Sequence, residues 1–222
     1  MTRTTLFACE IPWARGGSYD EQSMQPFLAG LCELHQVRCL YRTFTQSGEL
    51  AALLSSTNIP AANGQRVIVY LSAHGSGGRL YTEMEKSVNL LPIAKKAARA
   101  IEGIWIGACD VGASEAPEEF LRNGGASWAG GFTCAIDWKD AVLIDLAVLQ
   151  AALGGHKPKN RSAVIHLFAN ALTAFSPTWI VDSHADIPLW KALRVWGRDR
   201  TSGPTTEDLT EDILKKLKWP TG

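Results

Sequence analysis

Two continuous apolar runs, each bounded by glycine, constrain the fold of this 222-residue chain more than any other feature. The first covers residues 66–75, with the sequence RVIVYLSAHG, and the second covers residues 103–110, with the sequence GIWIGACD. Runs of this length that are rich in β-branched residues are typical of strands buried on both faces of a parallel sheet. The separation of 35 residues (109 − 74) between their carboxyl ends leaves room for one crossover connection, so the two strands can be parallel neighbours.

Strand and helix patterns alternate along the rest of the chain, which predicts an α/β fold. Besides the two apolar runs, we expect strands over residues 5–11, 37–44 and 126–136 and a hairpin near 79–82. We expect three helices that begin after Ser23, at Ser47 and at Pro117. Four further helices are expected over about 90–100, 141–153, 162–175 and 207–218. The stretch from Pro177 to Pro204 is only loosely patterned. No internal repeat or low-complexity linker divides the chain. We therefore expect a single domain over residues 1–222, with a core over 1–153 and a C-terminal elaboration over 154–222.

Composition argues against several classes of function. Lys plus Arg and Asp plus Glu both number 22, so the net charge is zero and binding of nucleic acid by bulk charge is not expected. The five cysteines, at 9, 32, 39, 109 and 134, lack C-x-x-C spacing, and the histidines lack ligand spacing. This pattern predicts no disulfide framework, no metal site and no cofactor, and it fits a reducing compartment.

Neither the N-terminal residues nor the most apolar later window predicts a secretory or membrane-spanning segment. The first ten residues have too short an apolar stretch for the h-region of a signal peptide. The most apolar later window, residues 141–153, is shorter than the roughly 20 residues that a spanning helix needs. The sequence therefore predicts a cytoplasmic protein that does not enter the membrane.

An imidazole and a thiol, His74 and Cys109, stand at the carboxyl ends of the two apolar runs. Ligands and chemistry in parallel sheets collect beyond these strand ends. A free thiol has a pKa near 8.5 and needs a base to become a nucleophile at neutral pH, and His74 can activate it or protonate a leaving amine. Gly75 lets its backbone N–H approach a substrate carbonyl. This pattern indicates a cysteine hydrolase; the alternative is that Cys109 is a small core residue and His74 a turn residue.

The segments YLSAHGS (residues 70–76) and IWIGACD (residues 104–110) resemble the signature of the caspase-like superfamily of cysteine peptidases, in which one hydrophobic strand ends in His-Gly and a second ends in the nucleophilic Cys. This superfamily includes caspases, metacaspases, legumains, separases and the CHAT proteases, and the resemblance, to a small prokaryotic member, covers roughly residues 4–150. It implies a caspase-like three-layer sandwich with a mostly parallel central sheet flanked by helices. It also implies an intracellular endopeptidase with a His74–Cys109 dyad and an oxyanion hole made by the N–H groups of Gly75 and Cys109. Protein or peptide substrates, an activating protein partner and a role in bacterial antiviral defence or regulated death follow from the same resemblance.

Two charged residues compete for the substrate side chain before the scissile bond. Asp137 follows the strand after the one that bears Cys109, and a carboxylate there selects Arg or Lys, as in metacaspases and separases; Trp138 beside it supplies an apolar wall. Arg15 follows the first strand and loosely resembles the Arg-x-Gly segment with which caspases bind Asp. We favour Asp137 over Arg15, and either residue can instead be an exposed loop charge.

Two other classes of function remain open. One is a non-catalytic module that keeps the fold as an interaction scaffold, which the presence of both His74 and Cys109 disfavours. The other is a cysteine hydrolase of small amides, which requires a deep closed pocket where a peptidase requires an open groove. The glycine-rich segment Gly75–Gly78 lacks the Gly-Lys-Ser/Thr ending of a phosphate-binding loop, and we expect it to form a flap beside the site.

Overall fold

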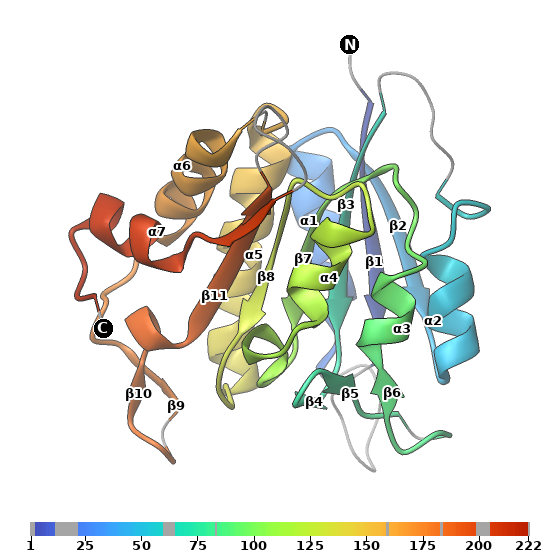
Figure 1. Ribbon diagram of the computed structural model, residues 1–222, viewed down its shortest axis with the longest axis horizontal. Coiled ribbons are helices and arrows are strands. Elements are labelled where there is room, and N and C mark those ends of the chain that lie inside the picture. The colour runs from blue at the N-terminus through green and yellow to red at the C-terminus, as the bar shows by residue number, and fades with distance from the viewer. Residues whose placement is uncertain are drawn as a thin grey trace.

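The computed structural model describes residues 3–11, 22–59, 65–82, 84–158, 160–182, 184–198 and 205–221, and a seven-stranded sheet forms the centre of this part of the chain (Figure 1). In spatial order its strands are β12 (Thr206–Asp208), β11 (Leu193–Arg198), β8 (Trp128–Phe132), β7 (Ile101–Gly107), β3 (Gln65–Ser72), β1 (Arg3–Glu10) and β2 (Arg38–Thr43). Neighbouring strands from β8 to β2 are parallel, whereas β11 is antiparallel to both β8 and β12.

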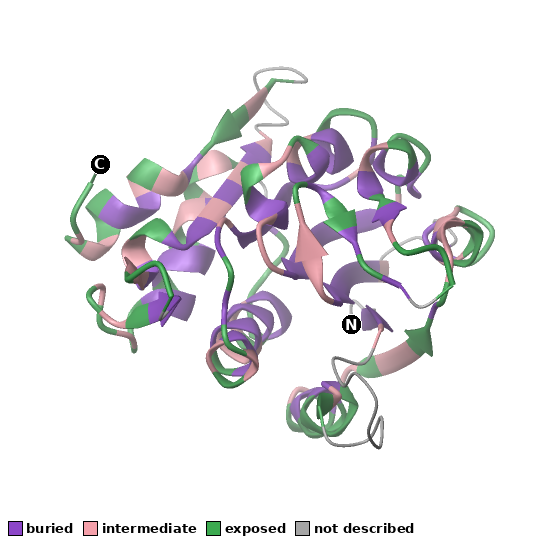
Figure 2. Ribbon diagram, turned by 90° about the horizontal axis from the view of Figure 1, so that it is seen from below, coloured by how far each residue is buried: buried purple, intermediate pink, exposed green. Residues whose placement is uncertain are grey.

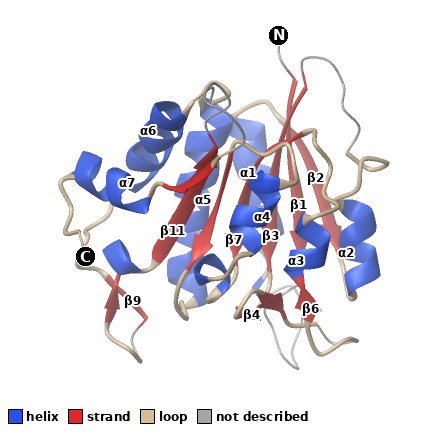
Figure 3. Cartoon of the chain, in the orientation of Figure 1, coloured by secondary structure: helices blue, strands red, loops and turns tan. Residues whose placement is uncertain are grey.

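Helices cover both faces of this sheet and make three layers, as the colouring by secondary structure shows (Figure 3). One face carries α1 (Gln25–Leu34), α5 (Trp138–Gly154), α6 (Arg161–Leu172) and α7 (Thr210–Leu217), and the other carries α2 (Ser47–Leu53), α3 (Leu90–Ala94) and α4 (Ala116–Arg122). Two separate hydrophobic clusters fill the two interfaces. The three-layer α/β sandwich with a mostly parallel central sheet, expected from the sequence, is confirmed.

The two apolar runs form the middle of the sheet because both of their faces are covered. Every residue of β7 is buried, and every residue of β3 after Gln65 is buried as well. Alternate side chains go to opposite layers: Tyr70 and Trp105 pack with the α5 cluster, whereas Leu71 and Ile106 pack with the α3 cluster. Viewed from below in Figure 2, the buried colour runs through the strands between the two helical layers.

A second, three-stranded sheet lies at the carboxyl edge of the central sheet, below it in Figure 1. It consists of β4 (Gly75–Ser76), β5 (Arg79–Leu80) and β6 (Val88–Asn89). The two-residue loop between β4 and β5 is Gly77–Gly78, with φ of +54° and +77°. Positive φ at both positions is what a type I′ hairpin turn requires, and glycine adopts it without strain. A hairpin is thus present, but it begins earlier than the expected position near 79–82 and directly follows His74.

Several elements end earlier than their sequence pattern predicts. The helix expected over about 90–100 ends at Ala94, and the strand expected over 126–136 ends at Phe132. The N–H of Thr133 donates to the carbonyl of Ala192 at 2.8 Å, which continues the antiparallel ladder with β11 one pair beyond Phe132 and Leu193. Residues beyond 153 also contribute to the central sheet through β11 and β12, where the sequence pattern was too loose to predict a strand.

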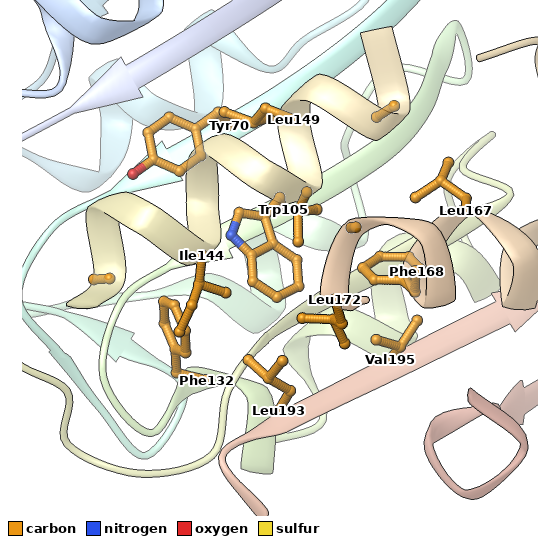
Figure 4. Packing of buried hydrophobic residues seen from close by; sticks show 14 of the residues in the cluster. Tyr70, Trp105, Phe132, Ile144, Leu149, Leu167, Phe168, Leu172, Leu193 and Val195 are labelled. Atoms are coloured by element: carbon orange, nitrogen blue, oxygen red, sulfur yellow. The ribbon is translucent and has the colours of Figure 1, made fainter. Parts of the chain in front are cut away.

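A buried carboxyl group lies between α5 and the central strands. Asp145 is 1% exposed, and its two oxygens accept hydrogen bonds from Tyr70 Oη and Trp105 Nε1, both at 2.5 Å. Figure 4 shows Tyr70 and Trp105 packed under α5, among Ile144, Leu149 and Phe168. Burial raises the pKa of Asp145 from 3.8 to about 7, against the two hydrogen bonds, which lower it.

This raised pKa makes the stability of the fold depend on pH. The folded protein holds the Asp145 proton up to about pH 7, whereas the unfolded chain releases it near pH 4, so folding takes up a proton between these values. The contribution is fully present below the unfolded pKa and is lost as the pH rises through the folded pKa. We expect Asp145→Asn to remove a slope of at most about 1.4 kcal/mol per pH unit from the free energy of unfolding.

Urea unfolding of wild type and Asp145→Asn across the window from about pH 4.5 to about pH 6.5 measures this slope. The exposed Asp186 provides the matched control, since Asp186→Asn removes a carboxylate without touching the buried site. Equal pH dependence in wild type and Asp145→Asn would show that Asp145 does not hold a proton in the folded state.

Candidate active site

His74 and Cys109 occupy equivalent positions at the ends of neighbouring parallel strands. In the ladder between β3 and β7, the last residues Ser72 and Gly107 are paired, and His74 and Cys109 each lie two residues beyond the end of their strand. Both side chains are half-buried, and Cys109 is a free thiol. The fold therefore brings the two predicted residues to the same edge of the sheet at the same level.

The pleat also directs Cys109 to one particular face. Trp105 on β7 packs in the cluster under α5, and Cys109, four residues later, packs against the same cluster. Ala108 belongs to the opposite cluster, under α3 and α4. Tyr70 on β3 packs under α5, and His74 lies four residues later, so the alternation of side chains along an extended chain puts both on the same face. The alternation thus favours a shared face for His74 and Cys109.

Gly75 packs directly onto the backbone of the cysteine segment. A Cβ at position 75 would lie 2.8 Å from the carbonyl oxygen of Cys109, 2.9 Å from Val111 Cγ2 and 3.0 Å from Ala108 Cβ. Only glycine allows the two segments to approach this closely. The residue after His74 is therefore held against the residue that carries the thiol.

The backbone N–H of Gly75 is not used by the hairpin that it begins. The N–H of Tyr81 donates to the carbonyl of His74 at 2.8 Å, and Gly75 faces Leu80 across the hairpin. Hydrogen-bonded and non-hydrogen-bonded pairs alternate in an antiparallel ladder, so Gly75 and Leu80 form a non-hydrogen-bonded pair. The Gly75 N–H consequently points away from β5, as an oxyanion donor must.

The loop that follows β8 lies against the thiol. The N–H of Ile136 donates to Cys109 Sγ at 3.4 Å, and the N–H of Asp110 donates to the carbonyl of Cys134 at 3.1 Å. Burial raises the pKa of the Cys109 thiol; the N–H groups of Ile136 and Cys109 itself lower it, and the charges of Asp110 and Asp182 raise it further. The resting group is therefore a protonated thiol, which needs a base when substrate is attacked.

Asp137 and Trp138 lie on the α5 side of this thiol. Asp137 is exposed and precedes the first turn of α5, one residue after the Ile136 that contacts Cys109 Sγ. Its negative charge adds to burial in raising the pKa of Asp140. Trp138 is half-buried, and its ring packs edge-on against Phe27 of α1 with the centroids 6.1 Å apart. Arg15, the competing substrate-binding candidate, lies outside the described residues.

One acidic neighbour of the thiol was missed in the sequence. Asp182 ends β9 (Ile180–Asp182), which pairs with β10 (Ile187–Pro188) at the carboxyl edge (Figure 1). It is 7% exposed, and its Oδ1 accepts hydrogen bonds from the N–H groups of His184 and Ala185 at 3.0 and 3.1 Å. An Asp that bonds the backbone two residues on is a recognisable turn signal, but nothing in the sequence connects this turn with Cys109.

Two further properties concern only the described part of the chain. There, no group of three or more His, Cys, Asp or Glu side chains is arranged to hold a metal ion. None of the helices described is long and apolar enough to cross a bilayer.

Comparison with known proteins gives likenesses among solved structures only. No family model matches the chain, and no curated protein matches its sequence. Among solved structures, the chain is similar to a secreted C11 cysteine protease from Bacteroides thetaiotaomicron, determined in complex with an irreversible peptide inhibitor, with a TM-score of 0.48 and 13% sequence identity. The match covers 88% of this chain and 66% of the length of that protein.

Proposed function

We propose that this chain is a cysteine endopeptidase of the caspase-like type that cleaves after a basic residue with His74 and Cys109. The observation that carries the proposal is the matched placement of the two residues at neighbouring strand ends, with Gly75 packed on the Cys109 backbone. A core cysteine or a turn histidine gains nothing from such a placement, whereas a nucleophile and its base require it.

In the proposed reaction, His74 accepts the thiol proton while Cys109 Sγ bonds to the carbonyl carbon of the substrate. The oxyanion that forms accepts hydrogen bonds from the N–H groups of Gly75 and Cys109. The C–N bond then breaks, and His74 gives the proton to the leaving amine. Water attacks the thioester, the C–S bond breaks, and the carboxylic acid leaves as Cys109 regains its proton.

The charges around the thiol support a basic residue before the scissile bond. Besides burial, the charges of Asp110 and Asp182 both raise the pKa of Cys109, so two carboxylates contribute negative charge near the sulfur. Asp137 adds an exposed carboxylate on the α5 side, and the stem of an Arg or Lys can lie along Trp138. A guanidinium or ammonium group is favoured in this field, and a carboxylate is disfavoured.

Asp137→Asn is expected to lower kcat/KM for substrates with Arg before the scissile bond by about ten- to a hundredfold. The loss is smaller than for a fully desolvated ion pair, because Asp137 is exposed and its charge is screened by solvent. The measurement is a fluorogenic series with Arg, Lys, Asp or Leu before the cleaved bond, run on wild type, Asp137→Asn and the control Asp140→Asn.

Each outcome of this series has a distinct meaning. If the wild type hydrolyses none of the four substrates, the proposed function is wrong. A preference for Asp transfers the specificity role to Arg15. A basic preference that survives Asp137→Asn removes Asp137 from the substrate-binding residues.

A further inference from the structure

A groove of about 650 Å³ begins beside the two proposed catalytic residues, on the face of the sheet that carries α3 and α4. Its walls come from three segments: the β4–β5 turn over residues 76–79, the start of α3 at Asn89 and Leu91, and the chain from Asp110 to Ala116. A volume of this size is in the range of sites that bind drug-sized ligands, and it is sufficient for a short stretch of peptide.

The groove is continuous with the proposed active site through the chain itself. Ser76 in its wall follows Gly75, and Asp110 in its wall follows Cys109. Gly75 and the Cys109 backbone are in contact, so the two walls meet where the oxyanion is proposed to form. A peptide bound with its carbonyl carbon at Cys109 Sγ thus has an open path into this groove.

The two halves of such a peptide leave the carbonyl carbon in opposite directions. The Cys109 side chain packs against the α5 cluster, and the loop with Ile136 and Asp137 approaches it from that side. The groove lies on the other face, against the first turn of α4. If the residue before the scissile bond is on the Asp137 side, the residues after it extend over the α4 side.

We propose that this groove binds the leaving half of a peptide substrate, namely the residues that follow the scissile bond. The inference rests on the proposed function and adds to it a second recognition surface, opposite Asp137. Gly77 in its wall is exposed and has open space where a side chain would be, so an extended chain can lie close to the hairpin backbone there. Two carboxylates, Asp110 and Glu115, line the groove against one cation, Arg79, which favours a leaving segment that carries positive charge.

The substitution Ala113→Trp tests the groove by filling it. Ala113 is exposed, lines the groove and is not among the residues that contact the thiol. Two substrates share the acyl residues that the wild type prefers: one continues for four residues after the cleaved bond, and the other is a methyl ester, whose leaving methanol cannot occupy the groove. We expect kcat/KM to fall by at least about tenfold for the long peptide and by less than about twofold for the ester.

Ala29→Trp is the matched control, because Ala29 is an exposed residue of α1 on the opposite face. Equal losses on both substrates, or no loss on the peptide, would overturn the proposed role of the groove. Failure of the wild type to hydrolyse either substrate would instead contradict the proposed function, and the role of the groove with it.

A charge reversal provides a second test that does not depend on a bulky side chain. Glu115 is exposed and lines the groove, so Glu115→Lys is expected to fold normally. Two peptide substrates are compared, one with Glu and one with Lys in the segment after the cleaved bond. The kcat/KM for the Glu substrate divided by that for the Lys substrate should be several-fold higher in Glu115→Lys than in the wild type, with ester hydrolysis unchanged. An unchanged ratio would show that the leaving segment does not pass Glu115.

Discussion

Replacement of Cys109 by alanine is expected to lower kcat/KM for peptide hydrolysis by at least about a thousandfold. The reason is that the reaction proposed for this chain passes through a bond between Cys109 Sγ and the carbonyl carbon, and no neighbouring group replaces it. The thiol is half-buried and its hydrogen bonds are with the backbone of Ile136, so its loss costs little packing. The measurement is the rate of hydrolysis of the best fluorogenic substrate, together with a thermal unfolding curve.

Cys39→Ala is the matched control for this variant. Cys39 is also half-buried, but it lies on β2, the strand at one side of the sheet, where it is paired with Leu6 of β1. We expect Cys39→Ala to retain the activity of the wild type. Undiminished hydrolysis by Cys109→Ala would place the nucleophile elsewhere.

Gly75→Ala is expected to lower kcat by about a hundred- to a thousandfold, with a much smaller change in KM. A Cβ at this position would lie 2.8 Å from the Cys109 carbonyl oxygen, closer than real Cβ contacts come, and this oxygen belongs to rigid backbone. The hairpin must therefore move away from Cys109 and take the Gly75 N–H with it. Because the oxyanion exists only in the reaction, the loss appears in kcat.

Alkylation of Cys109 by iodoacetamide separates this effect from damage to the thiol, since alkylation uses no oxyanion donor. We expect Gly75→Ala to be alkylated at nearly the rate of the wild type. Gly30→Ala on α1 is the control, because a Cβ there would meet no atom within 4 Å. A kcat unchanged by Gly75→Ala would exclude the Gly75 N–H from the oxyanion site.

The parts of the fold that the sequence predicted best are those that depend on burial alone. β3 and β7 are covered on both faces, and their continuous apolar runs are the direct consequence. The apolar segment 141–153 likewise forms most of α5, and the majority of its residues are buried. Its buried polar residue, Asp145, is accommodated because Tyr70 and Trp105 donate to it across the layer, which no local pattern reveals.

The elements that the sequence did not predict are fixed by contacts between distant segments. β11 does show the alternation of a half-buried strand, with Leu193 and Val195 facing the core. Trp196 stands on its more exposed face beneath the guanidinium of Arg194 and obscures this pattern. The partner of β8 on this side is β11, about sixty residues away in sequence, and this antiparallel pairing cannot be read locally.

The same distinction applies to the candidate site. His74, Gly75 and Cys109 could be placed at one edge because strand ends of a parallel sheet meet there. The contact of Ile136 with the sulfur and the approach of Asp182 depend on how two loops fold over this edge. Asp137 follows Ile136 in the chain, so the course of its segment could be predicted only as far as the end of β8.

Covalent labelling by a peptide chloromethyl ketone with a terminal Arg reports on recognition and on the nucleophile together, because the reagent must be recognised as a substrate before it alkylates the thiol. We expect one label per chain, mapped to Cys109 by mass spectrometry. We also expect the label to be absent from Cys109→Ala, strongly slowed in His74→Ala and unchanged in Cys39→Ala. A label on Cys39 or any other cysteine, or unimpaired labelling of Cys109 in His74→Ala, would contradict a His74–Cys109 peptidase.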